Sequence, residues 1–297
     1  MPSTRDIRRR IKSVKSTAQI TKAMQLVAAA KMKKAQDQAN NGRAYAELLN
    51  KILVALRDAA EDGSHPYFDE GKGDKTLVLV IASDKGLCGA LNTNLFKKLI
   101  STKLEGDIEY VTIGRKATQF ISRIKKTLLA DFPIKDPAKF TDLRAAGNYV
   151  QEQFRSGSFK KIYVAFNNFI NTVTIQPTVE QLLPVDKVKL GGKRSFEGMG
   201  KEEIVDAAAS APLEYKFEPD PASVFASVLP QYVNGTLYQM LLEARASEHS
   251  SRMVAMKNAT DNAKQMLKDL SLEYNKLRQA AITNELLEIT TAKMALE

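Results

Sequence analysis

The chain has 297 residues, of which 44 are lysine or arginine and 34 are aspartate or glutamate, giving a formal net charge of +10. The single cysteine, Cys88, excludes an internal disulfide and a cysteine-built metal site, and the two histidines lie far apart in sequence. No apolar run approaches the roughly 20 residues that a membrane-spanning helix needs. We therefore expect a reduced, cytoplasmic-side protein with no metal.

The positive charge is concentrated at the start of the chain. Residues 1–34 contain ten basic residues and one acid, Asp6, whereas residues 222–297 contain eight basic and eight acidic residues. A net charge of +9 on one element favours binding to an acidic partner surface. The start lacks the apolar core and cleavage site of a secretory signal, and we interpret it as mature structure.

An apolar stripe predicts a long helix in the first segment, residues 1–60. Alternating steps of four and three define a seam with the 3.5-residue spacing of a coiled coil. The seam consists of Ile7, Ile11, Val14, Ala18, Thr21, Gln25, Ala28, Met32, Ala35 and Ala39. A second stripe of Ile20, Met24 and Val27 lies beside it, and we expect Gly42 to interrupt the helix.

The middle segment, residues 75–218, alternates strand and helix patterns, which is typical of a small α/β domain. We expect strands at 76–81, 108–113 and 161–166, an antiparallel return strand at 171–180, and helices at 90–104, 116–125 and 140–154. The apolar run at 76–81 is the kind found in a buried parallel sheet. A loop with a short helix is expected over 186–212.

The last segment, residues 220–297, predicts a second long helix that begins near Pro221 and contains Pro230. Its stripe consists of Met253, Met256, Thr260, Ala263, Leu267, Leu270, Tyr274, Leu277 and Ala281, and then shifts to Ile282, Leu286, Ile289 and Leu296. Because both terminal helices share the same spacing, we expect them to form one long antiparallel coiled coil, with a small Rossmann-like α/β domain between them in the sequence.

The turn at residues 83–89 (SDKGLCG) lies where a nucleotide-binding fold would place its phosphate loop. It matches neither the GxGxxG nor the P-loop pattern, so we favour glycines that let strand and helix pack closely. Cys88 has no histidine nearby in sequence to act as a base, which favours a structural thiol. We predict no catalytic, cofactor-binding or metal-binding residues, with a nucleotide-binding enzyme as one rival.

A basic coiled-coil protein that binds nucleic acid is the second alternative. Its affinity for any duplex would fall steeply with salt. Against it, no aromatic residue precedes Tyr45, so platforms on which bases stack are missing from the basic helix.

Four separated motifs resemble the gamma subunit of F-type ATP synthases. They are residues 20–31 (ITKAMQLVAAAK), 83–89 (SDKGLCG), 246–257 (ASEHSSRMVAMK) and 275–286 (NKLRQAAITNEL). Together with the junction at 215–220 (YKFEPD), the likeness spans essentially the whole chain. The resemblance implies a rotor shaft that lies along the axis of an alpha/beta hexamer. Rotation of the c-subunit ring, driven by ions, would then turn the shaft and force ATP synthesis or hydrolysis in the partners.

The resemblance also implies partner-binding residues. Lys22 and Met24 would face acidic loops of the beta subunits. Arg278, Gln279 and Thr283 would contact a catch loop of the hexamer, with Arg252 and Glu285 supporting rotor coupling. Tyr215 and Glu218 would contact the c ring, beside the epsilon subunit, at the cytoplasmic face of a bacterial membrane. The end of the chain departs from the family pattern at 290–294 (TTAKM), and the paired cysteines of chloroplast members are absent.

Overall fold

A computed structural model describes residues 4–59, 65–185 and 218–296. Contacts divide the chain into two units, the first containing Met1–Ala28 and Arg252–Glu297 and the second containing Ala29–Ser251. The two terminal helices, α1 (Thr4–Ala59) and α5 (Pro221–Leu296), contribute to both units. The three segments expected from the sequence are a different division, and their boundaries stay a prediction.

Helix α1 passes through Gly42 without a break, so the predicted interruption is wrong. Glycine in a helix interior costs only about 1 kcal/mol relative to alanine. The helix buries Ala39 on one side of Gly42 and Leu49 on the other, so packing outweighs this local cost.

Helix α5 begins as the sequence predicts. Oδ1 of Asp220 accepts a hydrogen bond from the backbone N–H of Ser223 (2.8 Å), and Oδ2 accepts one from the Ser223 hydroxyl (2.6 Å). Pro221 follows at the first helical position, where its missing N–H costs nothing. Pro230 lies inside the helix.

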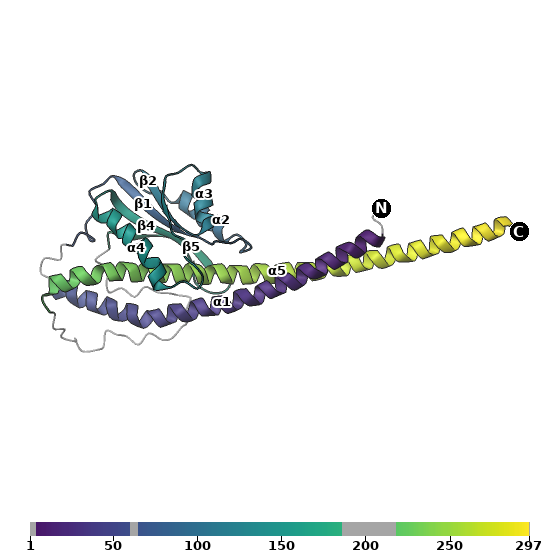
Figure 1. Ribbon diagram of the computed structural model, residues 1–297, viewed down its shortest axis with the longest axis horizontal. Helices are drawn as coiled ribbons and strands as arrows, with labels where there is room; N and C mark the ends of the chain where they lie inside the picture. The colour runs from purple at the N-terminus through teal and green to yellow at the C-terminus, as the bar shows by residue number, and fades with distance from the viewer. Residues whose placement is uncertain (1–3, 60–64, 186–217, 297) are drawn as a thin grey trace. The chain divides into compact units, whose positions relative to one another are not determined.

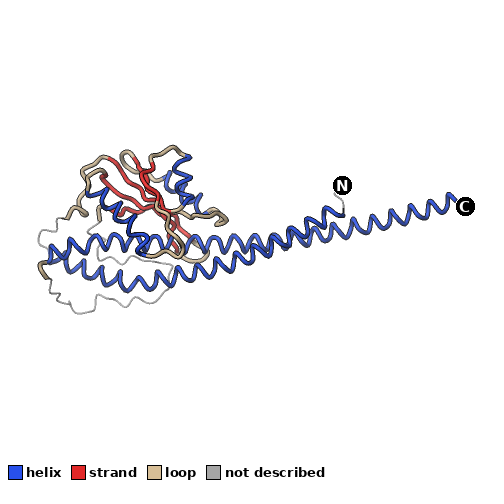
Figure 2. The backbone as a smooth tube through the Cα atoms, viewed as in Figure 1, coloured by secondary structure: helices blue, strands red, loops and turns tan. Residues whose placement is uncertain are grey.

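In the first unit, α1 and α5 run antiparallel (Figures 1 and 2). Ile7, Thr21 and Ala28 are buried in α1, and Met256 and Thr260 are buried in α5. The remaining predicted seam positions of α1 are half-buried or buried, as are those of α5 up to Leu277. The predicted antiparallel coiled coil is therefore confirmed.

The second unit contains a five-stranded sheet with the order β3-β2-β1-β4-β5. Its strands are β1 (Lys75–Ile81), β2 (Ile108–Ile113), β3 (Leu128–Asp131), β4 (Phe159–Phe169) and β5 (Ile175–Leu183). Strand β1 pairs in parallel with β2 and β4, β3 pairs in parallel with β2, and β5 pairs antiparallel with β4. The central position of β1 explains its continuous apolar run.

Helices cover both faces of this sheet (Figure 1). Helices α2 (Leu91–Ser101) and α3 (Arg115–Arg123) bury Leu95 and Ile121 against one face. Helix α4 (Phe140–Arg155), the first part of α5 and the second half of α1 form the core on the other face, with Val150, Leu237 and Leu53 among its buried residues. The expected α/β architecture is confirmed.

Strand β3 and the start of strand β5 differ from expectation, and β4 is longer than the strand expected at 161–166. Strand β3 was not predicted, because its four residues at an edge are too short for a periodic signal. Strand β5 starts at Ile175 rather than at residue 171, because Oδ1 of Asn171 accepts hydrogen bonds from the backbone N–H groups of Val173 and Thr174 and closes a turn there. The loop expected at 186–212 lies outside the described residues.

Candidate functional site

Two hydrogen bonds define the register of the helix pair in the first unit. The hydroxyls of Thr21 and Thr260 are 2.7 Å apart in the buried seam, and Nη2 of Arg8 donates to the hydroxyl of Tyr274 at 2.8 Å. Along α1, Arg8 lies 13 residues before Thr21, and along α5, Tyr274 lies 14 residues after Thr260, so the two contacts fit one antiparallel register. The described part of α1 begins at Thr4, so α5 beyond Leu277 has no partner helix among the described residues.

The outer surface of α1 in this unit combines basic and apolar side chains. Met24 is 41% exposed, Ile20 is 56% exposed and Val27 is 57% exposed. Lys22 is exposed beside them, with its Nζ 3.3 Å from Oε1 of Gln25. The second stripe predicted from the sequence therefore faces outward, next to basic groups, and is available to a partner.

The residues of α5 that the resemblance singles out also lie on an exposed surface. Arg278, Gln279, Thr283 and Glu285 are all exposed, and the Thr283 hydroxyl donates to the Gln279 carbonyl at 2.9 Å. The hydroxyl is thus held against its own helix, while the charged and amide groups extend outward.

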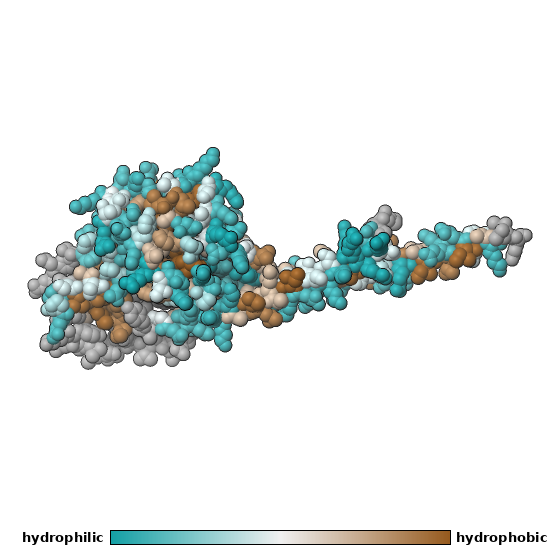
Figure 3. Space-filling model, viewed as in Figure 1, coloured by the Kyte–Doolittle hydropathy of each residue, from teal (hydrophilic) through white to brown (hydrophobic). Residues whose placement is uncertain are grey.

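The end of α5 is apolar as well as exposed, as Figure 3 shows by its brown atoms. Leu286 is 57% exposed, Ile289 is 66% exposed and Met294 is 78% exposed. Side chains of this kind in a row, rather than singly, indicate a surface that another molecule covers.

The structure brings some of the predicted partner-binding residues together and separates others. Measured along the axis of the helix pair, Arg252 lies within about two helical turns of Met24. Arg278 lies about 30 Å from Met24 along the same axis. Glu218 is exposed three residues before α5 begins, in the second unit, and Tyr215 lies outside the described residues.

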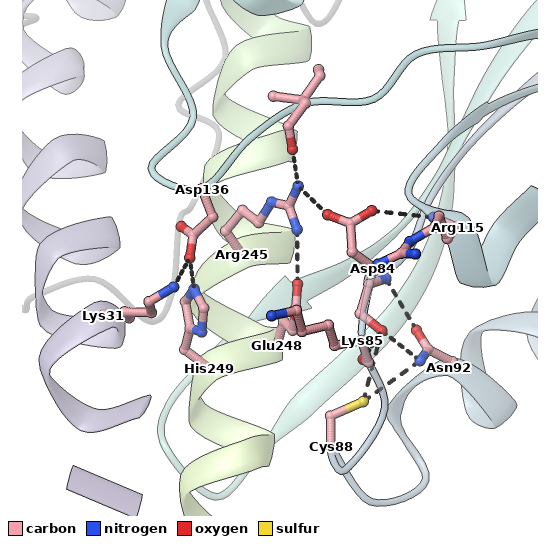
Figure 4. A network of polar contacts seen from close by, with 12 residues as sticks. Lys31, Asp84, Lys85, Cys88, Asn92, Arg115, Asp136, Arg245, Glu248 and His249 are labelled. Atoms are coloured by element: carbon pink, nitrogen blue, oxygen red, sulfur yellow. Dashed lines mark hydrogen bonds and ion pairs between the residues drawn. The ribbon is translucent and has the colours of Figure 1, made fainter. Parts of the chain in front are cut away.

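A polar network in the second unit was not predicted from the sequence (Figure 4). Arg245 of α5 donates to Glu248 (3.0 Å), to the carbonyl of Ile134 (2.7 Å) and to Asp84 (3.4 Å). The side chain of Arg245 is 5% exposed, so these partners compensate for the burial of its charge. The spacing of Arg245, Glu248 and His249 along one helix was the available signal.

Asp136 joins this network to α1. Its Oδ2 lies 3.3 Å from Nε2 of His249 and accepts a hydrogen bond from Nζ of Lys31 at 2.7 Å. The hydrogen bond from His249 lowers the pKa of Asp136 most, burial opposes the shift, and Lys31 lowers the pKa further. Asp136 is therefore held ionised between two helices.

Two polar side chains of the turn at 83–89, Ser83 and Asp84, bind other parts of the chain. Asn92 donates to the Ser83 hydroxyl at 2.8 Å, and Oδ1 of Asp84 accepts the backbone N–H of Arg115 at 3.2 Å. Cys88 is 2% exposed, and Gly89 has a φ of +59°, which favours glycine. These contacts support the structural interpretation of the turn.

The described residues contain neither a metal-binding cluster nor a membrane-spanning helix. No group of three or more histidine, cysteine, aspartate or glutamate residues is placed to hold a metal ion within residues 4–59, 65–185 and 218–296. In the same ranges, no helix has an apolar stretch that is long enough to cross a bilayer.

Comparison with known proteins gives consistent matches along the chain. A family model described as ATP synthase matches residues 3–296. The ATP synthase gamma chain of Opitutus terrae is 47% identical over 295 residues, covering 99% of this chain and 99% of its own. That of Akkermansia muciniphila is 43% identical over 297 residues, covering both chains completely.

Solved structures share the fold. A chain of the Euglena gracilis mitochondrial ATP synthase (OSCP/F1/c-ring, rotational state 3) has a TM-score of 0.67 at 20% identity, covering 99% of this chain and 94% of that chain. A chain of the Tetrahymena thermophila mitochondrial ATP synthase central stalk and c-ring has a TM-score of 0.59 at 24% identity, covering 81% and 99%.

Proposed function

Because this chain belongs to the ATP synthase gamma chain family, we propose that it is the central rotor shaft of an F-type ATP synthase. The shaft transmits rotation of an ion-driven c ring to an alpha/beta hexamer, where ATP is made or hydrolysed. The comparisons lend no support to the alternative of a basic protein that binds nucleic acid.

The observation that carries this proposal is the exposed apolar end of α5. Ile282, Leu286, Leu287, Ile289 and Met294 are between 49% and 78% exposed. Leaving these side chains in water costs free energy that burial in an apolar sleeve recovers, at about 25 cal/mol per Å². Apolar contacts are non-directional, so a sleeve of this kind holds the helix without fixing its rotational angle.

The charge on α1 fits an acidic partner within the same assembly. Lys22 and Met24 form a basic and apolar surface that faces acidic loops of the beta subunits in our proposal. Attraction between exposed charges is local, because the Debye length is about 8 Å at physiological ionic strength. Arg278, Gln279 and Thr283 bind the catch loop, and Arg252 and Glu285 support coupling.

The chain itself carries no catalytic residues in this proposal. Two polar side chains of the turn at 83–89 are held by other parts of the chain: Asp84 by the backbone N–H of Arg115 and by Arg245, and Ser83 by Asn92. We place nucleotide chemistry in the alpha/beta partners. In the same proposal, Tyr215 and Glu218 contact the c ring beside the epsilon subunit, and the complex lies at the cytoplasmic face of a bacterial membrane.

Co-expression with bacterial alpha and beta subunits tests the proposal. We expect a purified complex that contains one copy of this chain and hydrolyses ATP rapidly, and we expect loss of this activity when residues 1–34 are deleted. A chain that fails to join the hexamer, or that hydrolyses ATP by itself, would refute the assignment.

A charge reversal tests the basic surface separately. We expect Lys22→Glu to reduce the ATPase activity of the assembled complex, with a larger loss at low salt, because like charges then face each other. Lys97→Glu is the matched control, since Lys97 is an exposed lysine on α2 of the α/β fold. Equal effects of the two reversals would argue against a specific role for Lys22.

A further inference from the structure

The order of the strands creates a switch point in the sheet between β1 and β4. The chain moves from β1 to β2 and β3 on one side and then returns to place β4 on the other side of β1. In open α/β sheets, ligands bind at this point, outside the carboxyl ends of the strands. The loops that lead out of β1 and β4 here contain Cys88 and Thr172.

In this protein, residues of α5 occupy that place. The Ser251 hydroxyl donates to the carbonyl of Cys88 at 2.6 Å, after β1. The Ser250 hydroxyl donates to the carbonyl of Thr172 at 2.9 Å, in the turn after β4. The Ser247 hydroxyl donates to the carbonyl of Asn167 at 3.0 Å, near the end of β4. The groups that would bind a ligand therefore bind a helix of the same chain.

The loop after β3 holds the same stretch of α5 through charged groups. Arg245 donates to the carbonyl of Ile134, and His249 contacts Asp136, which also binds Lys31 of α1 (Figure 4). Arg245 reaches Asp84 as well. We call the backbone and side-chain groups at Asp84, Cys88, Ile134, Asp136, Asn167 and Thr172 the collar.

The contacts with the collar point in different directions around the helix. Successive residues of an α-helix are about 100° apart around its axis. Relative to Arg245, the side chains of His249, Ser250, Ser247 and Ser251 therefore lie at about 40°, 140°, 200° and 240°. Residues 241–250 of α5 are buried on every side, which agrees with this arrangement.

This distribution resists rotation of α5 about its own axis. Hydrogen bonds weaken steeply as their angle departs from linear, whereas apolar contacts have no preferred direction. A small rotation of the helix would bend the bonds to several loops at once. The apolar core formed by residues such as Leu237 and Leu241 holds the helix against the sheet, and the collar adds directional contacts.

We propose that residues 245–251 of α5 and the collar form the joint that fixes the rotational angle of α5 relative to the sheet. Torque applied to the sheet passes through this joint into α5. The inference rests on the proposed function as a rotor shaft. It adds the contacts through which the α/β fold holds α5. Arg245, Ser247, His249, Ser250 and Ser251 are positioning residues in this proposal.

The test measures the stiffness of the joint in the assembled complex. The hexamer is fixed to a surface and a rotation probe is attached through Lys97→Cys on α2, while Cys88 stays protected by burial. The variance of the probe angle is recorded while the complex is stationary and waits for ATP to bind. The chain that carries only Lys97→Cys is the background. It is compared with chains that carry, in addition, either S247A/S250A/S251A or D136N.

The triple serine variant removes three of the six contacts named above between α5 and the collar within the described residues. If these bonds act in parallel and dominate the compliance, the angular variance rises toward about twofold, since variance is inversely proportional to stiffness. D136N keeps the shape of the side chain and removes the ionic attraction, so we expect a smaller rise.

The matched control is Ile121→Ala, which destabilises the sheet without touching the collar. Ile121 is fully buried against the face opposite to α5, and its truncation costs about 2–5 kcal/mol. We expect its angular variance to equal that of the background. A merely structural role of the collar predicts no difference between the control and the collar variants.

Two outcomes would overturn the inference. One is an unchanged variance in both collar variants. The other is loss of assembly by both collar variants while Ile121→Ala assembles, since the collar would then serve the fold rather than the joint. If the unmodified chain does not assemble and rotate at all, the proposed rotor function is wrong. Failure of the proposed function can therefore be told apart from failure of this inference.

Discussion

Replacing Gly147 by alanine tests how closely α4 and α5 pack in the second unit. A methyl group at this position would overlap Oδ1 of Asn234 and lie 3.1 Å from its Cγ and 3.7 Å from Cδ2 of Leu237. Asn234 is not free to turn away, because its Oδ1 accepts from Nε2 of Gln151 at 2.8 Å and its Nδ2 donates to Asn148 at 3.3 Å.

The expected magnitude follows from these contacts. Displacing Asn234 loses two hydrogen bonds, each with a net value of about 1 kcal/mol. Overpacking of the interface adds about 1–3 kcal/mol. The better helix propensity of alanine returns about 1 kcal/mol. We therefore expect Gly147→Ala to lower the free energy of unfolding by about 2–4 kcal/mol.

Gly235→Ala is the control, because Gly235 lies in α5 one residue from Asn234 and has nothing within 4 Å of the added methyl group. It should raise the free energy of unfolding by about 0.5–1 kcal/mol. Urea unfolding followed by tyrosine fluorescence measures both, since the chain has nine tyrosines and no tryptophan. If Gly147→Ala stabilises the chain as much as Gly235→Ala does, the close packing of α4 on α5 is wrong.

Three further predictions concern the seam, the polar network and the turn. Thr21→Val and Thr260→Val should each speed amide exchange in the helix pair about fivefold, a loss of about 1 kcal/mol, while the double variant should be nearly neutral; additive losses would contradict a shared hydrogen bond. The pKa of Asp136 is lowered in the folded state, so its contribution to stability is present above its unfolded pKa of about 3.9 and is lost as the pH falls below it. Unfolding in urea from pH 6 to about pH 2 should therefore show a shallower decline for Asp136→Asn than for the wild type; parallel curves would contradict the ionised contacts with His249 and Lys31. In calorimetry the isolated chain should bind no ATP, because α5 fills the switch point of the sheet, and saturable binding would reopen the turn at 83–89.

The helix pair could be predicted in detail because its signal is local and repeats. The ten seam positions between Ile7 and Ala39 were assigned by their spacing, and all ten are buried or half-buried. The outward-facing stripe of Ile20, Met24 and Val27 also followed from spacing. The register did not, because heptads match equally well when one helix is shifted by seven residues.

The sheet shows where local signals end. Strand β1 was evident because it is buried on both faces, but β3 has only four residues at an edge and was missed. The interruption expected at Gly42 failed because helix propensity is a weak, local term, and the packing of α1 outweighed it.

The sequence by itself determined that two long helices pair through a 3.5-residue seam, that the positive charge belongs to one of them, and that a strand-and-helix domain lies between them. Those features are carried by residues close together along the chain. Only the tertiary structure decided that Arg245, Ser247 and His249 meet loops that are far away in sequence, at the carboxyl ends of the strands. The physical reason is that a hydrogen bond between such distant residues depends on how the sheet places its loops around α5, which leaves no periodic pattern in the chain.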